Sequence, residues 1–180
     1  GAEKDVVNTS EKKEIVEELN LTADSKAATG ETVKINSAIY SVLDFNDTSE
    51  AECAAKGLID APKVLELKNA EGNVIWSQAA YSSVDDYEKA PDTVNPSLWE
   101  NTRNNHVYGL FEVMEGIYQV RGYDMANLTL IEGDTGWIVF DPLMSVECAQ
   151  AAMQLVEKNL GKKSVKAVLI SHSHVDHYGG

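Results

Sequence analysis

Three of the chain's four histidines lie in its last ten residues, SHSHVDHYGG, together with one aspartate. His172, His174, Asp176 and His177 follow the spacing His-x-His-x-Asp-His. Neutral imidazole nitrogens and carboxylate oxygens are ligands that zinc binds. A single surface histidine is usually only solvated, and a His-rich terminus can be a purification tag, but a tag is a run of identical residues. The spacing and the interposed acid therefore predict a metal site.

The segment before this motif, VKAVLI at 165–170, is short, β-branched and almost wholly apolar, which predicts a strand buried on both faces. Ligand sites in layered α/β proteins favour the C-terminal ends of strands. Alternate side chains of an extended chain share a face, so His172 and His174 can bind one ion as a pair. Asp176 and His177 follow where the chain turns, and can point at a second ion. Two metals ~3.5–4 Å apart are the usual arrangement for hydrolysis.

The motif after a hydrophobic strand resembles the signature of the metallo-β-lactamase superfamily. Two other stretches, PDTVNPSLW at 91–99 and GIYQVRGYDMANLTLIEGDTGWIVFDPL at 116–143, resemble the linear alkyl sulfatases of that superfamily. The resemblance implies an α/β fold, namely the first half of an αββα sandwich preceded by an irregular N-terminal section. Ser171 stands where threonine is expected and Tyr178 where phenylalanine is expected, and neither change removes a ligand.

The same resemblance implies a role for each residue of the motif. His172 and His174 would bind the first of two Zn²⁺ ions, and Asp176 and His177 the second, with Asp176 also the candidate catalytic residue. In such proteins the remaining ligands come from segments beyond the position of Gly180. We therefore expect the 180-residue chain alone to have little or no activity.

The activity that the resemblance implies is zinc-dependent hydrolysis of an alkyl sulfate ester, such as dodecyl sulfate, to an alcohol and inorganic sulfate. The complete protein is expected to be a homodimer. The motif alone is equally compatible with hydrolysis of a lactam, a thioester or a phosphodiester, and a non-enzymatic alternative is an inert fragment. Only the match over residues 91–143 favours the sulfatase.

The net charge of −14, from 15 basic and 29 acidic residues, argues against a nucleic-acid partner, which would need a basic surface. An anionic substrate is still compatible, because two zinc ions would place positive charge at the site itself. The sequence has no run of eighteen apolar residues, so it predicts no transmembrane helix. The polar opening would suit a tether behind a removed export signal. This predicts a periplasmic or secreted protein, with a cytoplasmic location as the alternative.

The sequence predicts three sections: a charged leader at 1–30, an N-terminal section at 31–108 that packs on the catalytic domain, and the first half of that domain at 109–180. Within the leader, 10–21 could form a short amphipathic helix. Further along, the pattern predicts a helix at 49–58, a hairpin at 64–76 and a long irregular loop at 81–105. Leu98 and Trp99 would pin this loop to the core, or its 92–99 stretch would approach the active site.

From residue 116 the pattern predicts strands at 117–121, 127–131 and 137–140, then a helix from Ser145 to about Leu160 that Gly161 ends. Asp141 stands between the last of these strands and the helix. It is either a turn former or, as the superfamily resemblance implies, a hydrogen-bonding support for the metal loop.

Three remaining side chains have simpler expectations. His106 lies in a polar stretch without a partner pattern and is predicted to be exposed. Cys53 and Cys148 lie far apart in sequence and are expected to be reduced thiols, with Cys148 partly buried, although a disulfide between them stays open.

Overall fold

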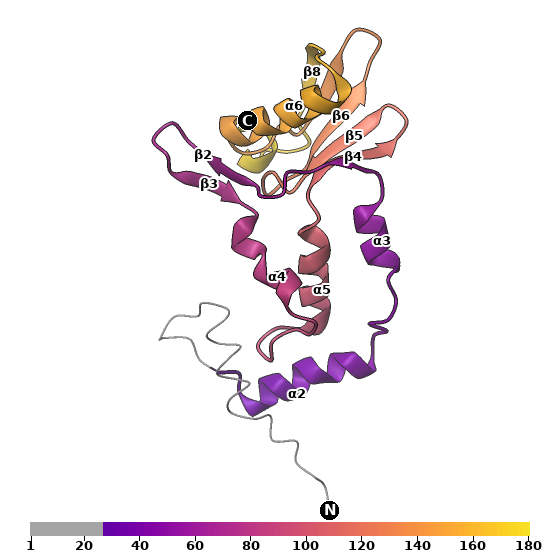
Figure 1. Cartoon of the computed structure of the whole chain (residues 1–180), viewed down its shortest axis with the longest axis vertical. Coiled ribbons are helices and arrows are strands. Elements are labelled where there is room, and N and C mark those ends of the chain that lie inside the picture. The colour runs from indigo at the N-terminus through magenta and orange to yellow at the C-terminus, as the bar shows by residue number, and fades with distance from the viewer. Residues whose placement is uncertain (1–26) are drawn as a thin grey trace, which may run out of the picture. The chain divides into compact units, whose positions relative to one another are not determined.

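The computed structural model describes residues 27–180, so the predicted helix at 10–21 and most of the charged leader lie outside the described residues. The chain divides into two compact units. Among the described residues, one consists of 27–46 and 85–101, and the other of 47–84 and 102–180. The second unit holds the sheets and the histidine motif (Figure 1).

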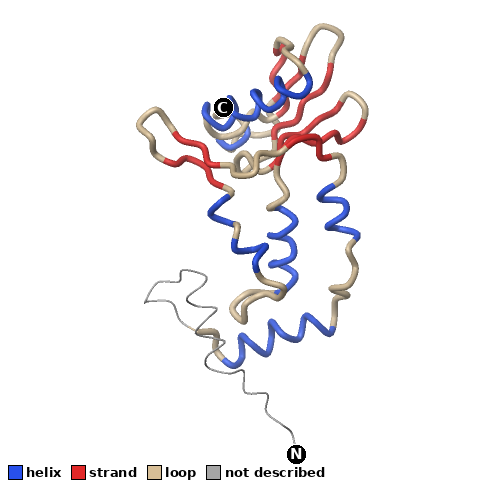
Figure 2. Tube along the Cα trace, viewed as in Figure 1, coloured by secondary structure: helices blue, strands red, loops and turns tan. Residues whose placement is uncertain are grey.

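The main sheet of this second unit has six strands in the order β1-β4-β5-β6-β7-β8 (Figure 1, Figure 2). All neighbours are antiparallel except β7 and β8, which are parallel because a helix connects them. The predictions of strands at 117–121 and 137–140 are confirmed, and the strand predicted at 127–131 begins and ends one residue later. The strands are β1 (Leu58–Asp60), β4 (Gly109–Met114), β5 (Ile117–Arg121), β6 (Leu128–Glu132), β7 (Trp137–Phe140) and β8 (Val165–Leu169).

Helix α6 (Val146–Leu160) connects β7 to β8 as predicted. Its N-cap is Ser145, whose side chain accepts a hydrogen bond from the backbone N–H of Cys148, and Gly161 ends it with a φ of 82°. The apolar face of α6 and the buried residues of the strands form one core. The fully buried members with the largest side chains are Trp137, Phe111, Leu110, Leu128, Leu130, Leu143, Val120 and Val156.

A smaller hairpin and short helical segments also belong to the second unit. Strands β2 (Glu66–Lys68) and β3 (Val74–Ser77) pair antiparallel, which confirms the predicted hairpin. The helix predicted at 49–58 is α3 (Ser49–Ala55), with Thr48 rather than Ser49 at its N-cap position. The segments η2 (Ala79–Tyr81) and α4 (Ser83–Asp86, across the unit boundary) follow β3.

The prediction of an irregular loop over 81–105 is wrong, because α5 (Pro96–Asn105) occupies its second half. The prolines suggested a loop, but proline is favoured at the first position of a helix, where its missing N–H costs nothing. Asn95 supports this start by accepting a hydrogen bond from the Ser97 N–H at 2.9 Å. Leu98 is 56% exposed and so does not pin the segment, whereas Trp99 makes an edge contact with Tyr87 within the first unit.

Described residues of the first unit also form α2 (Gly30–Ala38) and η1 (Ile39–Ser41). Thr29 caps α2 by accepting a hydrogen bond from the Thr32 N–H. Asn36 on this helix donates a hydrogen bond to the backbone oxygen of Asp92 at 2.8 Å, which ties the two separate stretches of the unit together.

Strand β8 differs from its prediction, because all five of its residues are exposed. It lies at the edge of the sheet and pairs only with β7. Its apolar composition is typical of a strand buried on both faces. Such burial requires other segments to pack against the strand, and no segment of the described residues does so. The predicted position of the motif just after the strand's C-terminal end is confirmed.

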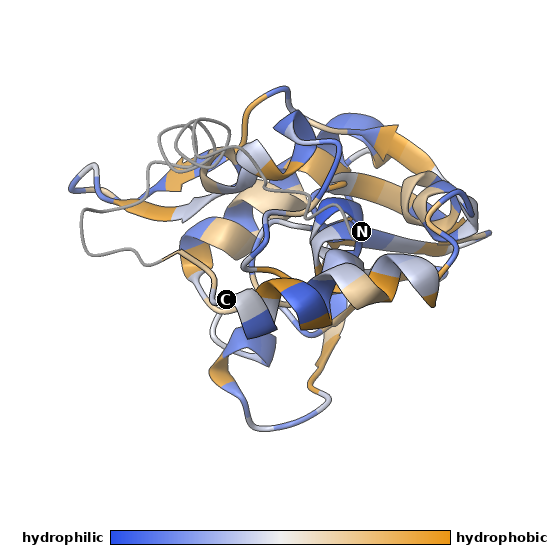
Figure 3. Cartoon of the chain, turned by 90° about the horizontal axis from the view of Figure 1, so that it is seen from below, coloured by the Kyte–Doolittle hydropathy of each residue, from blue (hydrophilic) through white to orange (hydrophobic). Residues whose placement is uncertain are grey.

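The helices that the structure describes carry both hydrophilic and hydrophobic residues along their length (Figure 3). None of these described helices is long and apolar enough to cross a membrane. Both cysteines are free thiols, Cys53 exposed and Cys148 buried.

Candidate metal centre

The histidine motif folds into one tight turn directly after β8. The segment η3 (Val175–His177) brings the chain round, with the His177 N–H donating to the His174 oxygen at 3.0 Å. The two closing glycines fit where a side chain would not. A Cβ on Gly179 would lie 2.1 Å from the backbone oxygen of Met144, and the N–H of Gly180 donates to the oxygen of Leu143 at 3.0 Å.

All four side chains of the motif come together in this turn. The Nε2 atom of His172 lies 3.1 Å from Nδ1 of His174, and Nε2 of His177 lies 3.1 Å from a carboxylate oxygen of Asp176. The rings of His172 and His177 are 4.1 Å apart between centroids, so the two pairs are adjacent. Two ligands of one tetrahedral zinc, with bonds of ~2.0–2.1 Å, are separated by ~3.3 Å. The spacing within each pair therefore fits two ligands of a common ion.

Each pair is a partial set of ligands. In the described part of the chain, no three histidine, cysteine, aspartate or glutamate side chains are arranged to hold a single ion. A four-coordinate structural or catalytic zinc takes three or four protein ligands. His172 and His174 are exposed, so further ligands have access to them. The donor chemistry fits a metal, and the assignment of each residue to an ion stays a prediction.

Asp141 accepts hydrogen bonds from Ser171 and His177, which favours a supporting role over that of a simple turn former. One of its carboxylate oxygens, Oδ2, lies 2.6 Å from Oγ of Ser171 and 2.7 Å from Nδ1 of His177. The other, Oδ1, accepts the N–H of Ser171 at 2.7 Å. Burial raises the pKa of the Asp141 carboxyl, but the hydrogen bonds from Ser171 and His177 outweigh it and the pKa is lowered overall.

These contacts assign the protons of two histidines. An ionised carboxylate only accepts, so the Ser171 hydroxyl and Nδ1–H of His177 both donate to Asp141. The Ser171 oxygen is then the acceptor for Nδ1–H of His172, at 2.8 Å. Both histidines therefore carry their proton on Nδ1 and present the Nε2 lone pair, as a metal ligand must.

The backbone around Asp141 is unusual. Asp141 has a φ of 55° and Leu143 a φ of 70°, both in the left-handed region that non-glycine residues seldom adopt. The N–H of Asp141 donates to the oxygen of Leu169 at the end of β8, and the N–H of Leu143 donates to the oxygen of Asp141. Strained residues of this kind cluster at functional sites.

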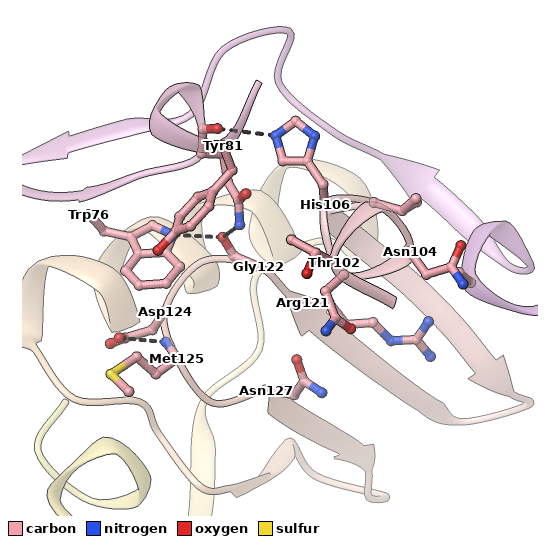
Figure 4. A pocket seen from close by; sticks show the side chains of 14 residues that line it. Trp76, Tyr81, Thr102, Asn104, His106, Arg121, Gly122, Asp124, Met125 and Asn127 are labelled. Carbon is pink, nitrogen blue, oxygen red and sulfur yellow. Dashed lines mark hydrogen bonds between the residues drawn. The ribbon is translucent and has the colours of Figure 1, made fainter. Parts of the chain in front are cut away.

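A cavity of about 480 Å³ opens elsewhere in the second unit (Figure 4). One wall is fixed by Trp76 and Gln78, whose side-chain N–H groups both donate to the oxygen of Gly122 at 2.7 Å. His106 also lines it, and its Nε2 donates to the backbone oxygen of Gln78 at 3.1 Å, so the prediction that His106 is simply exposed is wrong. No spacing in the sequence signalled this contact, because the partners are 28 residues apart. The other lining residues are Ala54, Tyr81, Thr102, Asn104, Asn105, Val107, Arg121, Asp124, Met125 and Asn127.

Comparison with known proteins gives consistent results. Residues 121–180 match the sequence model of the metallo-beta-lactamase superfamily. The chain is 46% identical over 156 residues to a linear primary-alkylsulfatase of Pseudomonas sp. and 48% identical over 157 residues to an (R)-specific secondary-alkylsulfatase of Pseudomonas sp.. It is 38% identical over 149 residues to an alkyl/aryl-sulfatase of Saccharomyces cerevisiae. These matches cover 83–87% of this chain, which spans only about 23% of each relative.

Among solved structures, the stereoselective inverting sec-alkylsulfatase Pisa1 from Pseudomonas sp. superposes with a TM-score of 0.79 at 47% identity. The match covers 88% of this chain and 25% of that one. The α/β architecture described above is thus the fold of a corresponding part of an alkylsulfatase. The chain is therefore similar to the metallo-beta-lactamase superfamily over residues 121–180, and to one part of the alkylsulfatases over most of its own length.

Proposed function

We propose that this chain supplies the first ligands of a dinuclear zinc centre to a longer protein that hydrolyses alkyl sulfate esters to an alcohol and inorganic sulfate. Similarity to the superfamily over residues 121–180 and to the alkylsulfatases supports a metal cofactor. The observation that carries the proposal is the pairing of donors, with 3.1 Å between His172 and His174 and 3.1 Å between Asp176 and His177. Sulfate ester hydrolysis is supported by the relatives, which are all named as alkyl sulfatases.

In this proposal His172 and His174 hold one ion, and Asp176 and His177 hold the other. When bound, zinc lowers the pKa of water and neutralises negative oxygens of a substrate. The chain's own contribution is to orient the ligands. Through Asp141 and Ser171, it keeps the protons of His172 and His177 on Nδ1, so that both Nε2 atoms are available.

The charge of the substrate is compatible with the net charge of −14, because two divalent ions at the site act at contact distance whereas surface acids are screened. Asp176 contributes its carboxylate as a ligand, and this is the sense in which we keep it as a candidate catalytic residue. The homodimer and the export to the periplasm or medium stay predictions.

The test compares the 180-residue chain with a protein extended past Gly180. We expect the extended protein to release sulfate from dodecyl sulfate and not to hydrolyse the lactam nitrocefin, while the 180-residue chain binds less zinc and releases little sulfate. His172→Ala and His174→Ala should abolish sulfate release. His106→Gln, a histidine outside the motif, should keep it as the matched control.

Each outcome has a separate meaning. Hydrolysis of nitrocefin alone would end the sulfatase proposal but leave the metal centre. Undiminished sulfate release by the His172→Ala and His174→Ala variants would end the metal centre itself.

A further inference from the structure

Asp124 is a buried carboxylate that the proposed reaction does not use. It is 5% exposed and lies in the loop between β5 and β6, at the wall of the cavity (Figure 4). Its Oδ1 accepts the N–H of Met125 at 2.7 Å, and its Oδ2 accepts the N–H of Met144, twenty residues away, at 2.9 Å. Burying a carboxylate is costly unless hydrogen bonds compensate, so both N–H contacts matter to the position of this side chain.

Met144 belongs to the strained turn that precedes α6. Two of the three residues before it, Asp141 and Leu143, have a positive φ, and such a backbone persists only where its surroundings hold it. The hydrogen bond from the Met144 N–H to Asp124 stabilises this backbone directly after Leu143.

The same turn also contacts the end of the histidine motif. The Gly180 N–H donates to the oxygen of Leu143 at 3.0 Å. A Cβ on Gly179 would lie 2.1 Å from the oxygen of Met144, and one on Gly180 would lie 2.0 Å from the oxygen of Pro142. Residues 142–144 of the turn are therefore in close contact with the end of the motif, and the N–H of Met144 in the same turn is held by Asp124.

We propose that Asp124 is a positioning residue of the metal centre, which fixes the 141–145 turn and, through it, both the Asp141 carboxylate and the closing glycines of the motif. This inference rests on the proposed metal site. It predicts that loss of the Asp124 carboxylate changes how the histidines hold a metal, although the hydrogen bonds of Asp124 go to the N–H groups of Met125 and Met144 and not to a histidine.

The test is a cobalt(II) titration of the full-length metal-free protein, with Asp124→Asn compared to Asp134→Asn. Asparagine keeps the volume, but its amide nitrogen cannot accept, so one of the two backbone N–H groups loses its acceptor. Asp134 is an exposed acid in the β6–β7 turn, so Asp134→Asn removes the same charge without a buried hydrogen bond. We expect the cobalt affinity of Asp124→Asn to fall roughly 10-fold with an altered visible absorption spectrum, as for loss of a group that orients ligands, and Asp134→Asn to match the unsubstituted protein.

A merely structural role would give a different result. Asp124→Asn would then melt at a lower temperature, equally with and without metal, while the folded molecules kept the original cobalt affinity and spectrum. That result would overturn the inference.

A second measurement uses no variant and so does not depend on whether Asp124→Asn folds. Cobalt binding to the unsubstituted protein should slow amide hydrogen exchange at Met144 and Met125, and leave the β2–β3 turn at 69–73 unchanged. Cobalt binding without protection at Met144 and Met125 would overturn the role of Asp124 alone. If the unsubstituted full-length protein bound no cobalt, the proposed metal site would fail, and this inference with it.

Discussion

Replacing Asp141 by asparagine should weaken metal binding through the protons of two histidines. In the structure one carboxylate oxygen accepts from Nδ1–H of His177 at 2.7 Å and from the Ser171 hydroxyl at 2.6 Å. In Asp141→Asn the amide oxygen can keep the N–H of Ser171, and the NH₂ group then faces these two partners. A donor opposite Nδ1 forces the His177 proton onto Nε2, and a protonated nitrogen cannot bind a metal.

The size of the effect follows from how many ligands are disturbed. Loss of one group that orients a ligand typically lowers metal affinity 10–100-fold, which is about 1.4–2.7 kcal/mol. Asp141 acts directly on His177 and, through Ser171, on His172 at 2.8 Å, so we expect the upper part of that range. The fold itself should lose only about 1–2 kcal/mol, because asparagine tolerates the φ of 55° and one charged acceptor becomes neutral.

The assay is competition for zinc against a chelator of known affinity, with the free energy of unfolding of the metal-free protein measured in urea. Ser171→Ala should break only the path to His172 and give a smaller loss. Ser171→Thr keeps the hydroxyl and should bind zinc as the unsubstituted protein does. Zinc affinity of Asp141→Asn within twofold of the original would refute the proton assignment on which this reasoning depends.

Two further predictions concern the fold. Gly122→Ala should destabilise the protein by about 2–4 kcal/mol in urea unfolding, since the φ of Gly122 is 73° and a Cβ there would lie 2.4 Å from Cβ of Tyr108. Gly72→Ala should cost only about 1–2 kcal/mol, because Gly72 has a φ of 85° but no atom within 4 Å of an added Cβ. Equal losses of stability in the two variants would contradict the packing argument. Burial raises the pKa of the Cys148 thiol to about 11, so iodoacetamide at pH 8 should label exposed Cys53 much faster than Cys148, as mass spectrometry would show. Rapid labelling of native Cys148 would contradict its burial. Because the pKa of this thiol is higher in the folded protein than in the unfolded one, the stability linked to it is complete below pH ~9 and is lost as the pH rises towards 11.

Local signals in the sequence predicted the second half of the chain well. The strands at 117–121 and 137–140 and the helix that ends at Leu160 follow from periodicity and from the caps Ser145 and Gly161, which act over a few residues. The gathering of the four metal-type side chains was also predictable, because all of them lie within six positions.

What the sequence did not reveal depends on contacts between distant segments. The exposure of β8 depends on which segments cover it, and composition cannot supply that. Asp124 looks like an ordinary turn residue, yet its partner Met144 lies 20 residues away. For Asp141 the residue pattern alone left a turn former open, and only the superfamily resemblance implied the support that its contact with Ser171, 30 residues away, provides. The prediction of a loop over 81–105 missed α5, because Pro96 is compatible with a loop and equally with the first position of a helix.

The most direct test of the central claim is a crystal of the full-length protein soaked with zinc and measured at the zinc absorption edge. We expect two anomalous peaks, one within bonding distance of His172 and His174 and the other within bonding distance of Asp176 and His177. A protein that releases sulfate from dodecyl sulfate while these four side chains carry no metal would contradict the account.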